Sequence, residues 1–360
     1  MPPVNRKKEL LFLPLYDKFI IASKNGRRMQ PNGKRITQGS IDNYEYALKL
    51  IKSFCHKEAF HLRLRPVKYL TKREILAEKK YWKTFYKKFT DYLYKDRGHY
   101  DNYVGQTLKV VRTFFNYLNK EQMLGVGDFH KLFFVRKEEV PVLTLLPEEL
   151  NFLIYDKTFE ENLPRKLKEA KNIFVFGCTV ALRFSDLMSL TKANLRKVNE
   201  QWYLIVRSKK TATETQIRLP DYAITILKNF KRRDSKLLPQ YYLSTLNDHI
   251  KIICEKAGFT QSVNKSRSVR GKLMSIKNVS NKTDQQYRFC DLVSSHTMRR
   301  TAITTMLCLG VPEQVVRKIS GHSPMSKEFF RYISLAQSYQ DNETSKMFEM
   351  LKEKRLVNTG

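Results

Sequence analysis

Cysteine is scarce in this chain, and its pattern argues against several kinds of site. The five cysteines are odd in number and widely scattered, at Cys55, Cys178, Cys254, Cys290 and Cys308. No CxxC pair or HExxH motif is present, and the seven histidines show no metal-ligand spacing. We therefore expect reduced thiols in core positions, no metal and a cytoplasmic location.

Long apolar runs are also lacking. No stretch reaches the roughly 18 apolar residues of a membrane-spanning helix. The N-terminus has no signal-peptide core with a cleavage site, and the C-terminus has no lipidation motif. These absences predict that the protein does not bind a membrane.

Acidic residues are in the minority. Against 67 Lys+Arg there are 35 Asp+Glu, which leaves a formal net charge of +32. This excess is far larger than solubility requires, and it favours a polyanionic partner. Nucleic acid is the first candidate, because clustered cations bind phosphates through counterion release.

Length and pattern predict a multi-domain, mainly helical protein. A chain of 360 residues exceeds what one hydrophobic core usually serves. We expect a basic N-terminal segment over residues 1–35, a helical domain over 36–130, an extended linker over 131–146, a second domain over 147–340 and a tail over 341–360. The tail carries an apolar face at helical spacing, which either packs on its own domain or docks elsewhere.

Local signals place three helices in the first domain. Ser40 is expected to cap the first helix, and Thr71 with Glu74 forms a capping box ahead of the second. The third follows Gly98. The second helix has a basic face, of which we assign Lys79, Lys83 and Lys87 to phosphate contact; the alternative is a solvated surface.

The second domain is predicted to combine helices with a small antiparallel sheet. A helix begins at Pro147, because proline suits the first helical turn. An apolar helix covers residues 172–181. Residues 202–206 and 216–219 are strand-like, and the cationic tip between them contains Lys209 and Lys210. A basic insert lies near residues 265–282.

Arginine and histidine side chains occur here at positions that suit an anion. Arg183 ends the apolar helix, and a buried guanidinium needs an anionic partner, which is either Asp186 or a bound phosphate. His296 and Arg299 are three residues apart and so share one helix face. Gly321 is expected to end a short helix and to aim the next residue, a histidine.

The ordered set resembles a known family. Its members are Arg183, Lys210, His296-x-x-Arg299, Gly321-His322 and Tyr332. This order resembles the signature of the tyrosine recombinases (integrases), and the likeness is greatest to integrases of bacterial mobile elements and phages. It covers about residues 36–340. Two features depart from the family: Val180-Ala181-Leu182 stands where Thr-Gly-Leu is commoner, and the interval from Gly-His to the tyrosine is one residue longer than in many members.

The resemblance implies a fold and an activity. The fold is a helical, SAM-like core-binding domain followed by a mixed α+β catalytic domain. The activity is DNA cleavage and rejoining through a 3′-phosphotyrosine on Tyr332, without a cofactor or metal. Arg183 and Arg299 would hold the phosphate, because a planar guanidinium matches its oxygens. Lys210, preferred over Lys209, would protonate the leaving oxygen, while His296 and His322 would hydrogen-bond the phosphate and the tyrosine.

Further expectations follow from the same resemblance. The partners would be double-stranded DNA with short inverted-repeat core sites, three further copies of the chain in a synaptic tetramer, and DNA-bending accessory proteins. The protein would act at the nucleoid of a bacterium. Residues 1–35 could bind separate arm sites, and the tail could dock on a neighbouring subunit. The alternatives are a type IB topoisomerase, a catalytically silent DNA-binding regulator, and Tyr339 in place of Tyr332 as nucleophile.

Overall fold

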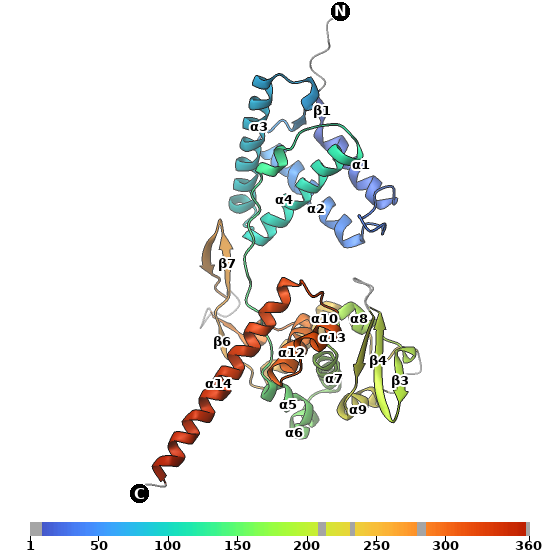
Figure 1. Ribbon diagram of the computed structural model, residues 1–360, viewed down its shortest axis with the longest axis vertical. Helices are drawn as coiled ribbons and strands as arrows, with labels where there is room; N and C mark the ends of the chain where they lie inside the picture. The colour runs from blue at the N-terminus through green and yellow to red at the C-terminus, as the bar shows by residue number, and fades with distance from the viewer. Residues whose placement is uncertain (1–8, 208–213, 231–234, 279–285, 358–360) are drawn as a thin grey trace, which may run out of the picture. The chain divides into compact units, whose positions relative to one another are not determined.

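The computed structural model describes residues 9–207, 214–230, 235–278 and 286–357, without side-chain detail at 342, 343, 346 and 349–357. The chain divides into two compact units. Unit 1 comprises Met1–Val140 together with Ser266–Ile276, and unit 2 comprises Pro141–Lys265 together with Lys277–Gly360. Figure 1 labels most of the helices and several of the strands of both units.

Unit 1 is a helical domain with two small antiparallel strand pairs. Its elements are β1 (Leu10–Leu11), α1 (Phe12–Lys24), α2 (Gln38–Lys57), β2 (Arg63–Leu64), η1 (Val67–Tyr69), α3 (Lys72–Asp91), η2 (Tyr92–Asp96), α4 (Asp101–Asn116), η3 (Tyr117–Glu121), η4 (Phe129–Leu132), β7 (Ser266–Val269) and β8 (Lys272–Ser275). Strand β1 pairs with β2, and β7 pairs with β8, both antiparallel.

Aromatic side chains form the centre of the unit 1 core. Phe12 and Phe19 of α1 are fully buried, and both rings pack edge-on against Phe114 of α4. The first helix is therefore part of the same core as α2 to α4, although we placed the boundary of the helical domain at residue 36. Helix α1 belongs to this domain because its apolar face leaves water only by packing on the neighbouring helices.

Helix starts follow local capping chemistry. The predicted capping box of α3 is confirmed, since the Thr71 hydroxyl accepts a hydrogen bond from the Glu74 backbone N–H and the Glu74 carboxylate accepts one from the Thr71 N–H. Helix α2 begins earlier than predicted. Its N-cap is Thr37, in extended conformation, and the expected cap Ser40 lies inside the first turn.

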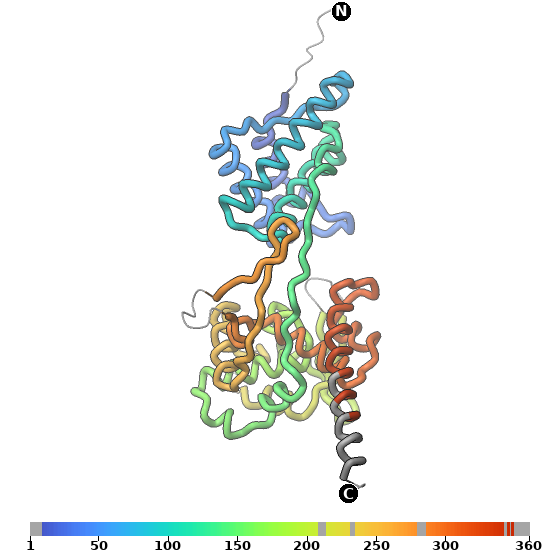
Figure 2. The backbone as a smooth tube through the Cα atoms, turned by 90° about the vertical axis from the view of Figure 1, so that its left-hand side faces the viewer, coloured from blue at the N-terminus to red at the C-terminus, as the bar shows by residue number. Residues whose placement is uncertain are grey.

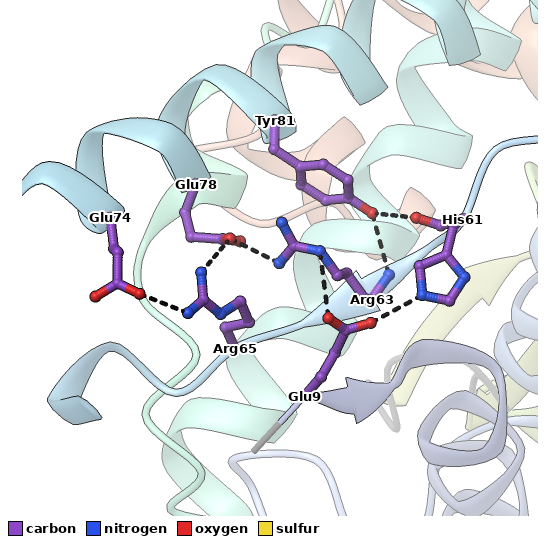
Figure 3. A network of polar contacts seen from close by, with 7 residues as sticks. All are labelled: Glu9, His61, Arg63, Arg65, Glu74, Glu78 and Tyr81. Atoms are coloured by element: carbon purple, nitrogen blue, oxygen red, sulfur yellow. Dashed lines mark hydrogen bonds and ion pairs between the residues drawn. The ribbon is translucent and has the colours of Figure 1, made fainter. Parts of the chain in front are cut away.

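A buried ion-pair network joins β2 to α3 (Figure 3). Glu78 is 1% exposed, and its Oε1 accepts hydrogen bonds from Arg63 at 2.6 Å and from Arg65 at 3.4 Å. Arg65 also donates to Glu74 at 2.9 Å. The Tyr81 hydroxyl accepts from the Arg63 backbone N–H. Two guanidinium groups thus compensate one buried carboxylate, which otherwise would be costly to desolvate.

The basic insert forms the β7–β8 hairpin, which the sequence did not predict. Both turn residues, Arg270 and Gly271, have positive φ, at 54° and 83°. Their backbone N–H groups donate to the two carboxylate oxygens of Asp101, each at 2.8 Å, and Asp101 is 2% exposed. The hairpin, drawn in orange in Figure 2, thereby docks on the helices of unit 1.

Unit 2 contains the remaining elements. They are α5 (Pro147–Tyr155), α6 (Lys157–Glu161), α7 (Arg165–Val180), α8 (Phe184–Met188), η5 (Lys192–Asn194), β3 (Leu195–Val198), β4 (Gln201–Arg207), β5 (Glu214–Arg218), α9 (Asp221–Asn229), α10 (Leu243–Lys256), β6 (Ser262–Val263), β9 (Tyr287–Arg288), α11 (Phe289–Leu292), α12 (Ser295–Cys308), α13 (Glu313–Ser320) and α14 (Lys327–Val357). The predicted helix start at Pro147 is confirmed.

A small antiparallel sheet and a close helix pair organise unit 2. The sheet order is β3-β4-β5, with Leu204 of β4 opposite both Leu195 and Ile217. Helix α12 packs against α7 and α14 (Figure 1). At the crossing with α7, Gly177 faces the fully buried Met298. The absence of a side chain on Gly177 lets the two helices approach closely, which sets the position of α12.

Among the described residues, none of the helices combines the length and apolar content that crossing a membrane requires.

Candidate active site

Four helix ends in unit 2 bring the predicted residues together. Arg183 follows α7, His296 and Arg299 lie in the first turns of α12, His322 follows α13, and Tyr332 lies in the second turn of α14. Arg299 hydrogen-bonds backbone carbonyls at the end of α7 and at the end of α13. The structure thus brings Arg299, His322 and Tyr332 into one cluster although up to 33 residues separate them along the chain.

The turn after α7 is made by an alanine in an unusual conformation. Ala181 is the C-cap of α7, with φ 55° and ψ 21°, which is the left-handed region that favours glycine. Glycine is commoner at this place in the tyrosine recombinase pattern, and it adopts the left-handed region without the strain that a Cβ introduces. Arg183 then follows in extended conformation as the N-cap of α8 and is half-buried.

Arg299 is the most deeply buried cation of the cluster. It is 3% exposed, and its guanidinium donates to the carbonyl oxygens of Ala181 at 2.7 Å and Ser320 at 2.6 Å. Burial, together with the nearby charge of Arg183, lowers the pKa of Arg299 to about 10. The side chain remains charged at neutral pH, and the two carbonyls orient its fork of donors.

His322 is positioned by a helix C-cap, as predicted. Gly321 adopts φ 62°, ends α13, and turns the chain so that the next side chain faces the cluster. The Ser320 hydroxyl donates to the Val316 carbonyl at 2.6 Å, so its oxygen is available to accept from Nδ1 of His322, which lies 2.8 Å away. In this arrangement Nδ1 of the imidazole carries the proton and Nε2 is unprotonated.

Burial and neighbouring positive charges lower the pKa of both histidines. Burial, Arg299 and Arg183 lower the pKa of His322 to about 3. Desolvation lowers the pKa of His296 as well, with further contributions from Arg300 and Arg299. Burial is the largest cause of both pKa shifts and neighbouring positive charge adds to it, so an anion placed among Arg183, His296, Arg299 and His322 would be stabilised by those charges.

Tyr332 is the tyrosine of this cluster. Its side chain is 5% exposed, and its ring centroid is 6.0 Å from that of His322. The rival candidate, Tyr339, lies two turns further along α14, and its hydroxyl donates to the Glu148 carboxylate at 2.5 Å. A carboxylate partner disfavours ionisation of a phenol, so the surroundings of Tyr332 suit a nucleophile better.

Other predicted residues lie elsewhere. Lys209 and Lys210 fall in 208–213, outside the described residues. The strands on both sides are described and pair with each other, Arg207 opposite Glu214, so the predicted hairpin is present up to its tip. Lys79, Lys83 and Lys87 occupy successive turns of α3 in unit 1, and all three are exposed.

The sequence did not single out Arg300. It follows Arg299 directly and is half-buried; burial lowers the pKa of its guanidinium, and the nearby Tyr332 opposes that shift. Consecutive residues on a helix point about 100° apart, so one position faces α7 and α13 while the next faces α14. The one sequence signal was its position beside Arg299, which is weak evidence for a functional role.

With this geometry established, the chain was compared with known proteins. The profile of the phage integrase family matches residues 158–338, half of the chain. The chain belongs to the phage integrase family. The matched range contains Arg183, Lys210, His296, Arg299, His322 and Tyr332. Comparison with curated proteins gave no match.

Solved structures of recombinases share the fold. XerH bound to a palindromic difH substrate is 13% identical with a TM-score of 0.57, and the alignment covers 93% of this chain and 85% of that one. A lambda integrase dimer bound to a COC′ core site is 14% identical with a TM-score of 0.55, covering 93% and 78%. A lambda integrase tetramer bound to a Holliday junction is 14% identical with a TM-score of 0.55, covering 90% and 80%. The predicted multi-domain, mainly helical fold is therefore confirmed.

Proposed function

We propose that this member of the phage integrase family is a site-specific DNA recombinase that cleaves and rejoins DNA through a covalent bond to Tyr332. The observation that carries the proposal is the buried, carbonyl-oriented charge of Arg299 in the same cluster as Tyr332 and His322. A site with this excess of positive charge suits a phosphate, and the tyrosine supplies a nucleophile beside it.

The proposed reaction is a transesterification. The Tyr332 oxygen attacks the phosphorus, a phosphorus–oxygen bond to the tyrosine forms, and the bond to the 5′-oxygen breaks. The phenol proton passes to Nε2 of His322, and Lys210 protonates the departing 5′-oxygen. Arg183 and Arg299 bind the non-bridging oxygens, where each such donor typically contributes about 3 to 4 kcal/mol of transition-state stabilisation. Rejoining is the same sequence in reverse.

Phosphate binding itself prepares the base. In the free protein, burial and the charges of Arg299 and Arg183 hold the pKa of His322 near 3, which makes its imidazole a weak proton acceptor. A phosphodiester between the two arginines would offset those charges and raise the proton affinity of the imidazole. Proton transfer from Tyr332 would thereby become favourable only when substrate is in place.

DNA binding would extend to unit 1. Lys79, Lys83 and Lys87 recur every four residues on the exposed side of α3, a spacing that aligns them along one helix face. We assign them to contacts with the phosphate backbone, with Lys209 contributing near the active site. The DNA would carry short inverted-repeat core sites, four subunits would assemble on two of them, and accessory proteins would bend the DNA.

The test is formation of a protein–DNA adduct. The substrates are nicked duplexes taken from the ends of the encoding element. Cleavage beside the nick releases a short strand, which prevents rejoining and traps the cleaved state. Each duplex would be incubated with wild type, Tyr332→Phe and Tyr339→Phe. We expect an SDS-resistant adduct from wild type and Tyr339→Phe and none from Tyr332→Phe. An adduct from Tyr332→Phe would refute the assignment of the nucleophile, and binding without any adduct would favour a silent DNA-binding regulator.

A further inference from the structure

Arg317 connects the end of α13 to the turn that follows His322. The residue is 8% exposed, and its Nε donates to Oε1 of Glu313, one turn earlier on the same helix, at 2.6 Å. Its Nη1 donates to the carbonyl oxygen of Ser323 at 3.0 Å. The same carbonyl accepts the backbone N–H of Ser326 at 3.0 Å, which closes the turn between the two helices. One guanidinium is therefore bonded both to its own helix and to the turn that leads into α14.

The face of the same guanidinium packs on the first turn of α14. Its central carbon lies 4.0 Å from the ring centroid of Phe329 and 5.4 Å from that of Phe330, which places the cation over both rings. Phe329 is fully buried, and its ring centroid lies 5.3 Å from that of His322 and 6.1 Å from that of Tyr332. Phe329 thus contacts Arg317 and also the two residues proposed to exchange a proton.

The turn between α13 and α14 buries little apolar surface. Ser323, Pro324 and Met325 are all exposed, and Met325 is 88% exposed. A segment with so little apolar burial has low local stability. Tyr332 lies in the second turn of α14, so its position depends on where this turn places the start of the helix. The bonds and the ring contact that Arg317 makes act at both ends of the turn.

We propose that Arg317 is a positioning residue, which fixes the start of α14 so that the Tyr332 hydroxyl reaches the bound phosphate. The inference rests on the proposed function, because it takes Tyr332 as the nucleophile. Cleavage is sensitive to such placement, since a displacement of 1 Å can cost about a hundredfold in rate. Arginine suits the role because a planar fork can bond Glu313 and Ser323 while its face packs on Phe329, whereas lysine has one donor nitrogen and no plane.

The test separates the placement of the tyrosine from the rest of the site by comparing cleavage with strand joining. Cleavage of the nicked duplex requires the Tyr332 oxygen. Joining is measured on a duplex whose 3′-phosphate carries p-nitrophenol. A DNA 5′-hydroxyl attacks the phosphorus, a phosphodiester forms, p-nitrophenolate departs with the electron pair of its bond, and the hydroxyl proton passes to solvent. This step needs the bound phosphate but no tyrosine hydroxyl, so it is measured in the Tyr332→Phe background.

The variant is Arg317→Lys, which keeps the positive charge that helps to lower the pKa of His322 but loses the fork. It should form the SDS-resistant adduct about tenfold more slowly than wild type, with unchanged affinity for the duplex. Joining should be as fast as in Tyr332→Phe alone. The matched control is Arg196→Lys at an exposed site of β3, which should change neither rate. Cleavage as fast as in wild type, or joining that falls as much as cleavage, would overturn the role.

A second variant covers the case in which Arg317→Lys fails to fold. Glu313→Ala leaves Arg317 in place and removes the carboxylate that orients it, so it should show the same split between cleavage and joining at smaller size. Equal effects on the two steps in this variant would overturn the role.

A further readout requires no DNA. 3-Fluorotyrosine placed at position 332 should give a single ¹⁹F line in the wild-type background, and Arg317→Lys or Glu313→Ala should broaden or split that line as α14 loses its fixed start. A line unaffected by both variants would overturn the positioning role. If wild type forms no adduct while the line still responds to the variants, the proposed function fails and the positioning of Tyr332 by Arg317 stands.

Discussion

The crossing of α7 and α12 should respond to the addition of a single methyl group. In Gly177→Ala, an ideal Cβ would lie 2.3 Å from Sδ of Met298 and 3.1 Å from both its Cβ and its Cγ. Carbon and sulfur atoms in contact normally lie about 3.5 to 4 Å apart, so Sδ must move by about 1.2 Å. Met298 is fully buried, and its own Cβ is fixed to the α12 backbone, so the helix must move as well.

Two opposing effects set the magnitude. Overpacking of this kind costs about 1 to 3 kcal/mol, and replacing glycine by alanine inside a helix contributes about 1 kcal/mol in return. We therefore expect Gly177→Ala to lower the free energy of unfolding of unit 2 by about 1 kcal/mol. Arg299 follows Met298 on α12, so adduct formation should fall by about tenfold, since a 1 Å misplacement costs about a hundredfold.

Differential scanning calorimetry of the full chain and the nicked-duplex assay measure the two effects. The matched control is Gly39→Ala in α2, where a Cβ would meet nothing within 4 Å and stability should not fall. In the background of Met298→Ala, which removes the clash, Gly177→Ala should become stabilising by about 1 kcal/mol. The reasoning is refuted if Gly177→Ala stabilises the protein when Met298 is intact, as helix propensity alone predicts.

Three further predictions concern the hairpin and the response to acid. Asp101→Ala removes the acceptors of the Arg270 and Gly271 amides, which should exchange with deuterium at least tenfold faster; unchanged protection would show that other contacts hold the hairpin. Hydrogen bonds from Thr71 and Arg65 lower the pKa of Glu74 from 4.5 to about 2. The stability that the ionised carboxylate contributes is therefore present above pH 4.5 and is lost as the pH falls toward 2. In Glu74→Gln, the free energy of unfolding should change less with pH across that window. The depressed pKa of His322 means that the folded state binds fewer protons than the unfolded state between pH 6.5 and about 3. The free energy of unfolding should therefore fall as the pH is lowered through that range. In His322→Asn, the slope of the free energy of unfolding against pH should be smaller there.

Local chemistry was predictable where one or two neighbouring residues decide the structure. The capping box at Thr71 and Glu74, the helix start at Pro147 and the left-handed C-cap at Gly321 all form as expected, because each depends on bonds within a single turn. Ser40 was a wrong cap because the N-cap of α2 lies three residues earlier, at Thr37, whose backbone is extended and whose side chain makes no cap hydrogen bond.

Strands with little apolar content were missed. Residues 195–198 form β3, whose side chains are largely exposed, and the turn that pairs it with β4 has positive φ at Asn199 and Glu200. The β7–β8 hairpin is similarly polar and is held by Asp101, which lies far away in the sequence. Neither β3 nor the two strands of the β7–β8 hairpin carry a clear alternation of apolar and polar residues, which is the signal that identifies a strand.

The sequence by itself indicated a polyanionic partner, the family likeness and the identity of the residues proposed to act, because net charge and the order of reactive side chains require no coordinates. Tertiary structure alone decided what surrounds each residue. The carbonyls that orient Arg299 and the approach of Tyr332 to His322 arise where α12 meets the ends of α7 and α13 and the start of α14. Such contacts depend on how closely helices pack, as at Gly177, and no periodicity along the chain encodes that distance.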